Sequence, residues 1–251
     1  MQLERQIEIL KLLHSGRAVT ISGLSSRFRV SQNTIRRDLK SLSARGIVKL
    51  THGGALPIDK LQMGLPLSER EVYQIEEKRA IGMKAAEIIE DGEAIALDAG
   101  TTTEQIALAV AEKKNLTVIT NGLNIAQTLS EAAGVTVVLI GGILNDITKC
   151  LAGFHAEQFI SQFHVKKAFI SAGGVSLDSI TNTNAFEVQI KRRMMDIAEE
   201  TYLVVTHHKI GKTSLAPFAR MQDFNVLLTD KGADPKSVEY YRQKGIRVLL
   251  C

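Results

Sequence analysis

The sequence predicts an α/β fold in two parts: a small N-terminal winged helix-turn-helix domain and a larger domain built on a mostly parallel sheet. The first 56 residues combine three amphipathic helical segments with a short Gly-rich hairpin. From Glu76 onward, apolar strand-length runs alternate with helical patterns, as in parallel α/β sheets. We therefore expect a helix-turn-helix domain over residues 1–57, a linker over 58–75 and the α/β domain over 76–251.

Positive charge is concentrated at the N-terminus. Residues 1–56 hold ten Lys and Arg against three Asp and Glu, a net charge of +7, whereas the remainder carries a net charge of −3. A small basic segment of this kind is typical of a protein that binds a polyanion such as DNA. The alternative is a solvated basic helix surface without such a role.

The 251 residues are 45% hydrophobic and 23% charged, as in an ordinary globular protein. The chain starts with charged residues, and its longest apolar runs, such as 135–140, have the length of a strand. We therefore expect no signal peptide, no membrane span and a cytoplasmic location. Cys150 and Cys251 lack metal-binding spacing, so neither a zinc site nor a disulfide framework is expected.

Two helices are predicted ahead of a third. The first has apolar residues at helical spacing and ends at a Ser-Gly pair; these are Leu3, Ile7, Leu10 and Leu13, then Ser15 and Gly16. Thr20 is placed to cap the second, in which Ile21, Leu24 and Phe28 face inward. The tight turn over residues 28–30 is typical of a helix-turn-helix arrangement.

The third helix begins after Ser31, whose hydroxyl is suited to cap its first turn. Ile35, Leu39 and Leu42 form its inward stripe. Its other face carries Gln32, Asn33, Thr34, Arg36, Arg37 and Lys40. Amide side chains suit base edges, and Arg and Lys suit guanine or phosphate, so this face and Ser31 are predicted to contact DNA. A generic helical bundle is the alternative.

A β-hairpin is predicted after this helix. It runs from Ile47–Leu50 through glycines at positions 53 and 54, and it reads as a wing beside the helices. Lys49 and His52 lie where side chains could touch backbone phosphate. They complete the predicted DNA-binding set.

The larger domain is predicted to alternate strands and helices throughout. The strands cover residues 94–98, 116–120, 135–140, 167–171, 202–205, 226–229 and 246–250. The helices cover about 77–90, a segment after 103, 123–132, 156–162, 186–199 and 235–244. Continuous apolar strands separated by helices favour a parallel, doubly wound sheet.

Polar and Gly-rich loops follow four of these strands. Ligands of parallel sheets bind beyond the carboxyl ends of the strands, where Gly, Thr and free helix amides suit a phosphate group. The predicted ligand-binding residues in these loops are Asp98, Gly100, Thr101, Thr102, Thr103, Asn121, Gly122, Gly141 and Gly142. The alternative is that the loops merely connect strands to helices.

The motifs of both parts resemble those of the DeoR family of bacterial transcriptional regulators. Thr34–Leu39, Gly46 and the HGGA segment His52–Ala55 occur at the spacing of that family's N-terminal signature. Asp98–Thr103 is similar to its DxGTT loop, and Thr120–Asn121 to its TN pair. The resemblance covers nearly the whole chain. It implies a winged helix-turn-helix that binds operator DNA and a ribose-5-phosphate-isomerase-like domain that binds phosphorylated sugars or polyols.

The resemblance also implies roles for residues further along the chain. Glu187 and Lys191 stand where the family has a Glu and a basic residue on a helix, suited to a sugar hydroxyl and a phosphate; Lys209 fits a later family segment. The alternative for Glu187 and Lys191 is an ordinary ion pair on a helix surface. The sequence departs from the family at Thr206, where an Asp is usual, which argues against the family's usual ligand contacts at this segment and against isomerase-like chemistry.

These features favour a repressor of a sugar or polyol utilisation operon, a DNA-binding homo-oligomer (dimer or tetramer) controlled by a phosphorylated sugar. One alternative is a sugar-phosphate isomerase with an accessory nucleic-acid-binding module, using Asp98 and Glu187 as acid and base. Another is nonspecific nucleic-acid binding. We expect no enzymatic activity and no cofactor. No metal is expected at His207–His208, because adjacent residues rarely share one ion.

Overall fold

The computed structural model describes residues 5–6, 8–9, 12–13, 19–44, 48–51, 53–57 and 67–251. The chain divides into two compact units, residues 1–63 and 64–251, and each is described by itself. Several residues that carried predictions lie outside the described ones: Leu3, Ile7, Leu10, Ser15, Gly16, Gly46, Ile47 and His52. The predicted domain boundaries stay a prediction.

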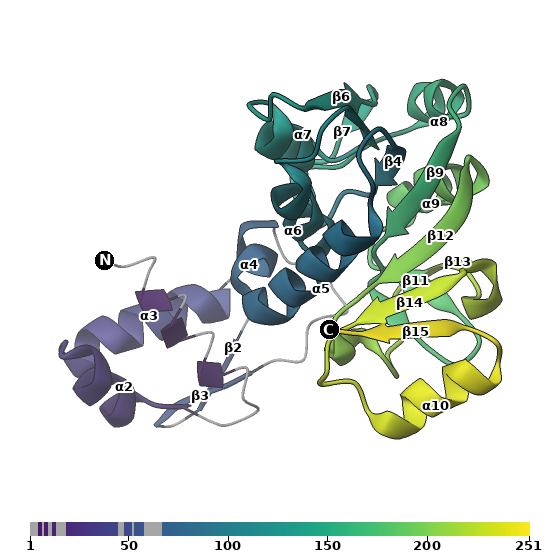
Figure 1. The fold of residues 1–251 in the computed structure, drawn as a ribbon. Coiled ribbons are helices and arrows are strands. Elements are labelled where there is room, and N and C mark those ends of the chain that lie inside the picture. Colours follow the sequence, from purple (N-terminus) through teal and green to yellow (C-terminus); the bar gives the residue numbers. More distant parts are fainter. Residues whose placement is uncertain are drawn as a thin grey trace. The chain divides into compact units, whose positions relative to one another are not determined.

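The N-terminal unit contains helical residues at its start, two further helices and a small sheet. Its elements are β1 (Val19–Thr20), α2 (Ile21–Phe28), α3 (Gln32–Ala44), β2 (Val48–Thr51) and β3 (Gly54–Pro57) (Figure 1). The Thr20 hydroxyl accepts a hydrogen bond from the Gly23 amide, and the Ser31 hydroxyl accepts one from the Thr34 amide, both at 3.1 Å. Both predicted helix caps are thereby confirmed. Arg29, with a left-handed φ of 52°, turns the chain between α2 and α3.

The core of this unit draws on all of its helices and on the sheet. Its buried apolar residues are Ile9, Leu13, Leu24, Ile35, Leu39, Leu42, Val48 and Ala55. The predicted inward stripe of α3 is therefore confirmed. Burial of each large apolar side chain stabilises the unit by roughly 1.5–3 kcal/mol.

The wing is a three-stranded antiparallel sheet in the order β1-β3-β2. β2 and β3 form the predicted hairpin, with Val48 opposite Pro57 and Thr51 opposite Gly54. β1 was not predicted, because two residues carry no periodicity. A Cβ on Gly54 would lie only 1.8 Å from the Val19 carbonyl oxygen, so the close approach of β1 to β3 requires glycine there.

The larger unit is built on a seven-stranded sheet whose strands all run parallel, which confirms the predicted α/β class. In spatial order the strands are β15 (Arg247–Leu250), β14 (Val226–Thr229), β12 (Ala198–Val204), β9 (Val165–Ile170), β4 (Ala94–Leu97), β5 (Leu116–Thr120) and β6 (Val135–Leu139). The chain winds from β4 out to β6, then returns to β9 and winds out to β15. The topological switch point therefore lies between β4 and β9.

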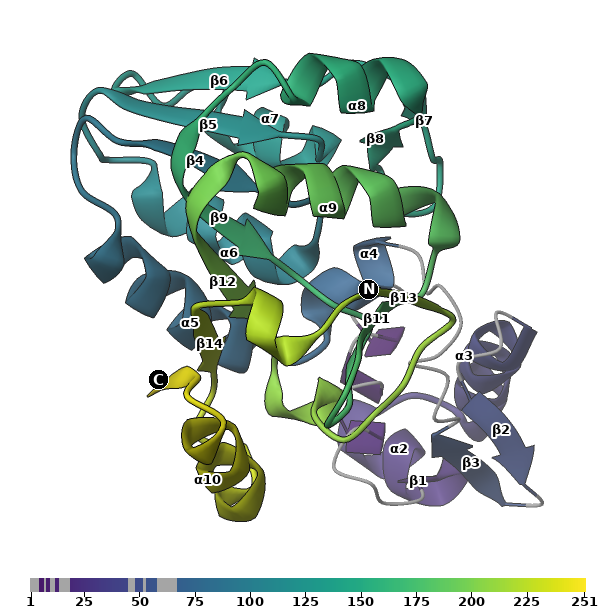
Figure 2. The same ribbon diagram turned by 90° about the vertical axis from the view of Figure 1, so that its right-hand side faces the viewer.

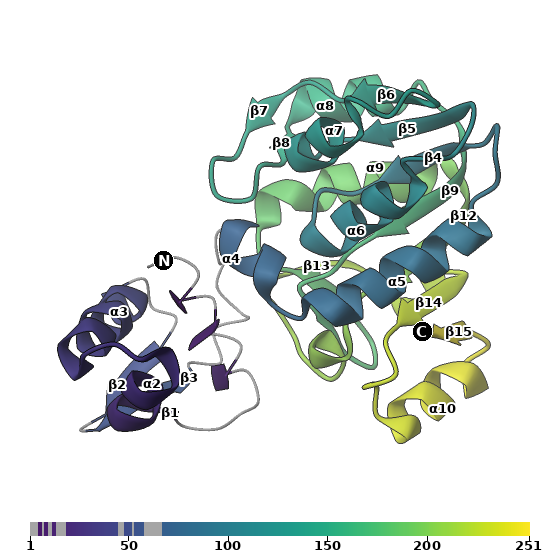
Figure 3. The same cartoon turned by 60° about the vertical axis from the view of Figure 1, so that its left-hand side comes forward.

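Helices cover both faces of this sheet. One apolar core joins the sheet to α5 (Ile75–Ile88), α6 (Thr101–Val110) and α7 (Leu123–Leu129), which come forward in Figure 3. A second core, on the other face, joins it to α8 (Phe154–Ile160), α9 (Val188–Asp196) and α10 (Pro235–Gln243); Figure 2 shows α8 and α9 on the side facing the viewer. The unit is thus a three-layer α/β/α arrangement.

Short elements complete the larger unit. β7 (Ile143–Leu144) pairs with β8 (Leu151–Ala152), and a small antiparallel sheet contains β10 (Gly174–Val175), β11 (Ile180–Asn182) and β13 (Ala216–Ala219). The 3-10 turns are η1 (Ala185–Glu187), η2 (His207–Lys209) and η3 (Met221–Asp223).

Helix α4 (Leu67–Val72) lies within the stretch predicted to be a linker. Leu67 is buried, and its amide donates a hydrogen bond to the Ile147 carbonyl at 3.1 Å. These contacts make α4 part of the larger unit.

Candidate functional sites

The outward face of α3 is accessible. Gln32, Asn33, Arg36, Arg37 and Lys40 are exposed, and Thr34 is half-buried. The Arg36 guanidinium donates hydrogen bonds to the side-chain oxygens of Asn33 at 3.0 Å and Gln32 at 3.4 Å. Two amides and a guanidinium are thus held together near the start of the helix, where helix-turn-helix proteins read base edges.

Polar contacts fix α3 within its unit. The Ser31 hydroxyl lies 3.0 Å from the Thr34 hydroxyl as well as capping the helix. On the inward face, the buried Asp38 carboxylate accepts hydrogen bonds from Arg5 Nε at 2.6 Å and Gln6 Nε2 at 3.4 Å. The Asp38 contacts were not predicted from the sequence, although Asp38 falls three residues after a member of the inward stripe. They tie α3 to the helical residues at the start of the chain.

The predicted DNA-binding set includes two wing residues, Lys49 and His52, and the structure describes the backbone of only the first. Lys49 lies in β2 opposite Leu56. His52 lies outside the described residues. Contact of either side chain with DNA stays a prediction.

A buried carboxylate stands at the carboxyl end of β4, at the switch point of the sheet. Asp98 Oδ2 accepts hydrogen bonds from the Ser171 amide at 2.9 Å and the Ser171 hydroxyl at 2.7 Å, at the end of β9. The Lys191 ammonium, from α9, donates to the same oxygen and to the Ser171 carbonyl at 3.1 Å. These contacts join the two halves of the sheet.

The loop after β4 is closed by its own hydrogen bonds. The Thr103 hydroxyl donates to the carbonyl oxygens of Asp98 at 2.5 Å and Gly100 at 3.0 Å, so this predicted phosphate ligand already has backbone acceptors. Thr101 and Thr102 are buried beside it. Because α6 begins at Thr101, its first-turn amides also belong to this loop.

The loop after β5 lies directly against the loop after β4. Asn121 Oδ1 accepts a hydrogen bond from the Ala99 amide at 3.0 Å, and a Cβ on Gly122 would lie 3.1 Å from Ala99 Cα. In contrast, Gly141–Gly142 at the end of β6 is exposed, and no hydrogen bond between described residues links it to Asp98. The structure thus brings together most, but not all, of the predicted loop residues.

Glu187 and Lys191 do not form the surface ion pair considered as an alternative. Both are buried, Glu187 Oε2 accepts a hydrogen bond from Asn182 Nδ2 at 2.9 Å, and Lys191 pairs with Asp98 instead. That alternative is therefore wrong, because the spacing of four places both residues on the inward face. Because Lys191 forms an ion pair with Asp98, its positive charge is already neutralised and would bind a phosphate only weakly.

The turn after β12 brings two further residues to the same edge of the sheet. The Lys209 ammonium donates to the Ala172 carbonyl at 2.5 Å, just beyond the end of β9. The buried Thr206 hydroxyl donates to Gln74 Oε1 at 2.7 Å. Lys209 thus joins the predicted site, and Thr206 contacts the start of α5.

The two adjacent histidines have other partners. His207 Nδ1 lies 2.6 Å from Asp230 Oδ2, and its backbone amide donates to Asp230 Oδ1 at 2.8 Å. The His208 ring centroid lies 5.9 Å from that of Tyr73. Burial lowers the pKa of His208, and the neighbouring His207 and Lys212 lower it further. In the part of the chain that the structure describes, no group of three or more His, Cys, Asp or Glu could hold a metal ion.

Two cations that were not predicted, Arg70 and Lys78, act on the predicted residue Lys209. The buried Lys78 ammonium of α5 donates a hydrogen bond to the Arg70 carbonyl of α4. Burial lowers the pKa of Lys78 to about 7, with a further contribution from the Arg70 charge. Burial also lowers the pKa of Lys209 well below its ordinary value, and the charges of Arg70, Lys78 and Lys191 add to this shift. Four cations therefore act on one another at this edge.

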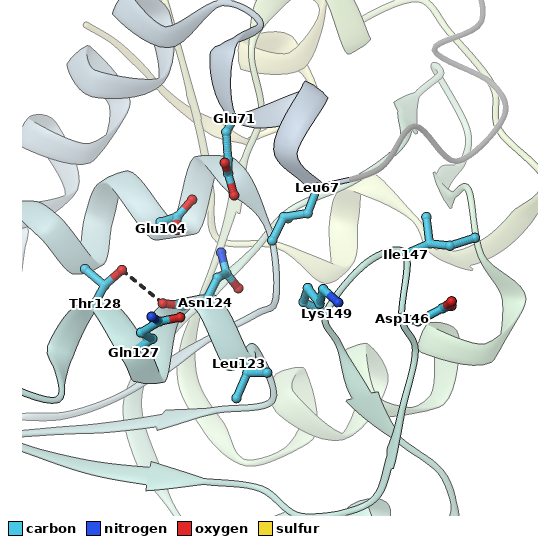
Figure 4. A pocket seen from close by; sticks show the side chains of 10 residues that line it. All are labelled: Leu67, Glu71, Glu104, Leu123, Asn124, Gln127, Thr128, Asp146, Ile147 and Lys149. Atoms are coloured by element: carbon cyan, nitrogen blue, oxygen red, sulfur yellow. Dashed lines mark hydrogen bonds between the residues drawn. The ribbon is translucent and has the colours of Figure 1, made fainter. Parts of the chain in front are cut away.

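A separate cavity of about 580 Å³ opens between α4, α6, α7 and the turn around Ile147 (Figure 4). None of the predicted ligand-binding residues is among its lining residues. Glu71, Glu104 and Asn124 give it a polar wall, and burial raises the pKa of Glu104. The side-chain amide atoms of Asn124 are buried without a hydrogen-bond partner among the described residues.

Comparison with known families identifies both parts of the chain. Residues 5–60 match the DeoR-like helix-turn-helix domain, and residues 73–231 match the DeoR C terminal sensor domain. The chain therefore belongs to the DeoR family of transcriptional regulators.

Curated relatives agree with this assignment. The chain is 34% identical to the transcriptional repressor AccR of Agrobacterium fabrum, over 91% of this chain and 90% of AccR. It is 30% identical to the regulator IolR of Bacillus subtilis, over the full length of both. It is 34% identical to the lactose phosphotransferase system repressor of Streptococcus mutans, over 93% of this chain and 94% of the relative.

A solved structure of ribose 5-phosphate isomerase A from Neisseria gonorrhoeae is also similar, with a TM-score of 0.39 and 16% identity over 53% of this chain and 52% of that chain. A similarity this low supports no statement about activity. The curated relatives are named as regulators or repressors, so the chain is a DNA-binding transcriptional regulator and not an enzyme. None of its described helices is long and apolar enough to cross a bilayer.

Proposed function

We propose that this regulator represses a sugar or polyol utilisation operon, and that a phosphorylated sugar bound by the larger unit modulates its operator binding. The main support is the set of polar groups and cations that meet at the carboxyl ends of β4, β5, β9 and β12. A sugar phosphate requires hydrogen-bond partners for its hydroxyls and positive charge for its phosphate, and this edge supplies both.

The names of two relatives support the sugar part of the proposal. They are the lactose phosphotransferase system repressor of Streptococcus mutans and the putative aga operon transcriptional repressor of Escherichia coli O157:H7, the latter 31% identical over 98% of this chain. The proposed effector-binding residues are Asp98, Gly100, Thr101, Thr102, Thr103, Asn121, Gly122, Gly141, Gly142, Glu187, Lys191 and Lys209.

The proposed DNA-binding residues are Ser31, Gln32, Asn33, Thr34, Arg36, Arg37, Lys40, Lys49 and His52. We further propose that the protein acts in the cytoplasm as a homo-oligomer, a dimer or tetramer, because operator half-sites mirror protein symmetry. Its DNA-binding domain would span residues 1–57. Helix α4, inside the stretch 58–75 predicted to be a linker, belongs to the larger unit, so the effector-binding domain would begin ahead of residue 76.

Control by a ligand requires that the sugar phosphate bind the DNA-competent and DNA-incompetent states with different affinities. A mobility shift on DNA upstream of the protein's own gene, titrated with a panel of sugar phosphates, tests this. Scrambled DNA and the unphosphorylated sugars are the controls. We expect sequence-specific retention, and a change in retention with one phosphorylated sugar but not with its parent sugar. Equal retention of scrambled DNA, or indifference to every sugar phosphate, would overturn the proposal.

A further inference from the structure

Three cations at the carboxyl edge of the sheet, Arg70, Lys78 and Lys209, have no anionic partner among the described side chains. The Lys78 ammonium donates to the Arg70 carbonyl, and the Lys209 ammonium donates to the Ala172 carbonyl at 2.5 Å. Among the described side chains of residues 67–251, no carboxylate lies within ion-pairing distance of Arg70, Lys78 or Lys209. Lys191 differs, because Asp98 neutralises it. A partly buried charge without a counter-ion is costly, so this edge of the sheet favours a bound anion.

These cations converge on the ends of the central strands. The Thr206 hydroxyl donates to Gln74 Oε1 at 2.7 Å. The backbone amide of Lys78 donates to the Gln74 carbonyl at 3.1 Å and that of Lys209 to the Thr206 carbonyl at 3.0 Å, so both lysines lie within a turn of this contact. The charges of Arg70, Lys78 and Lys191 lower the pKa of Lys209, and Asp98 acts against them. Burial raises the pKa of the Cys150 thiol, and Arg70 acts against that shift; Cys150 Sγ accepts a hydrogen bond from the amide of Asn121, beyond β5. The positive charge of Arg70 therefore influences Cys150, which is hydrogen-bonded to the residue after β5, and Lys209, which is hydrogen-bonded to the residues after β9; β5 and β9 are the two strands that flank β4.

The corner between α4 and α5 is built into this edge. Its Gln74 has a left-handed φ of 52°, a conformation uncommon outside glycine, which is retained where surrounding contacts hold it. Gln74 Oε1 accepts a hydrogen bond from Thr206, whereas Gln74 Nε2 is buried without an acceptor among the described residues. This unused N–H donor could form a hydrogen bond with an acceptor atom of a ligand.

We propose that Arg70, Lys78 and Lys209 form the phosphate subsite of the effector site, with Gln74 as an added donor, and that its ligand is a phosphate monoester. This rests on the proposed function and assigns the phosphate to the α4–α5 corner rather than to the Thr101–Thr103 loop. A guanidinium and two ammonium groups suit a dianion with three terminal oxygens. The carboxylates of Glu71, Glu77 and Glu104 act on Lys78 from farther away and do not pair with it.

Thermal unfolding and titration calorimetry of the full chain, with inorganic phosphate as the probe against chloride at matched ionic strength, test the subsite. We expect phosphate to stabilise the wild type, and Arg70→Gln and Lys78→Met each to weaken phosphate binding about tenfold to a hundredfold, the effect of losing a charge-assisted hydrogen bond. The matched control is Arg79→Gln, next to Lys78 but 59% exposed and paired with Glu76, which should bind phosphate like the wild type.

Wild-type-like phosphate binding by both variants would overturn the assignment, and so would a wild type that phosphate does not stabilise. Urea unfolding without phosphate separates loss of binding from loss of folding. Sugar phosphates in the same titration distinguish an ester from free phosphate: tighter binding of one ester supports the proposal, and no preference over inorganic phosphate contradicts it. If phosphate binds through these residues but no sugar phosphate alters DNA retention, the proposed function fails while the anion subsite stands.

Discussion

The Lys191 ammonium donates a hydrogen bond to Asp98 Oδ2, and both side chains are 1% exposed although they lie 93 positions apart in the chain. The same carboxylate oxygen accepts two hydrogen bonds from Ser171. An aspartate engaged in this way is poorly placed to take a proton from a substrate, which agrees with a role in holding the strand ends together.

Replacement of Asp98 by Asn should destabilise the larger unit by about 3–5 kcal/mol, because it leaves the buried Lys191 charge without a partner. Urea unfolding measures this. Replacing both charges, with Asp98→Asn and Lys191→Met together, should recover much of the loss. The control is Asp196→Asn, where Asp196 is 61% exposed and pairs with Arg193, and it should cost no more than about 1 kcal/mol. Equal effects of the two Asp substitutions would contradict the prediction.

Asn33→Ala and Arg37→Ala should weaken DNA binding in different ways. Loss of a base-reading amide should cost about 1–3 kcal/mol at one base position and relax the preference there, whereas loss of a phosphate contact should weaken all sequences and reduce the salt slope by about 1. Fluorescence anisotropy on an operator and its single-base variants, at several salt concentrations, separates these outcomes. A uniform loss of affinity in both variants would mean that Asn33 does not read a base.

Gly54→Ala should disrupt the wing, because the added Cβ meets the Val19 carbonyl oxygen at 1.8 Å, and backbone cannot move aside without breaking the β1–β3 pairing. Gly53→Ala is the matched control one residue earlier, since a Cβ there meets nothing within 4 Å. Thermal unfolding of the two variants should show a clear loss for Gly54→Ala alone. Similar unfolding temperatures would show that β1 is not held against β3.

The pH dependence of stability should report on Lys78. Its pKa is about 7 in the folded protein and 10.5 ordinarily, so between these values the unfolded chain binds a proton that the folded chain does not. Stability therefore rises with pH from about 7 to about 10, and this rise should shrink in Lys78→Met. Urea unfolding at several pH values in phosphate-free buffer measures it. Lys84→Met, which removes a partly exposed partner of Glu87, should keep the wild-type slope.

The sequence was informative wherever the relevant pattern was local. The caps at Thr20 and Ser31, the inward stripe of α3 and the apolar strands each depend on residues a few positions apart, and the structure confirms them. The helix predicted over 186–199 ran too far, because α9 ends at Asp196 and β12 already begins at Ala198. Glutamate favours helices, but Glu199 lies in β12 and forms an ion pair with Lys166 on the neighbouring strand β9.

Contacts between distant segments could not be read from the sequence. Arg5 with Asp38, Asp98 with Lys191, and Thr206 with Gln74 each depend on the assembled fold. The cations Arg70 and Lys78 fall in or beside a stretch that looked like a linker because it has little periodicity. Their importance follows from the burial of Lys78 and from the lack of a paired carboxylate among the described side chains.

The docking of α4 on the larger unit determines where the sensor part of the chain can be separated from the rest. A protein shortened to begin at residue 76 would lack Leu67, leave the Ile147 carbonyl without its donor and remove the Arg70 carbonyl that the buried Lys78 ammonium requires. A sensor fragment for crystallisation or ligand screening should therefore begin ahead of Leu67.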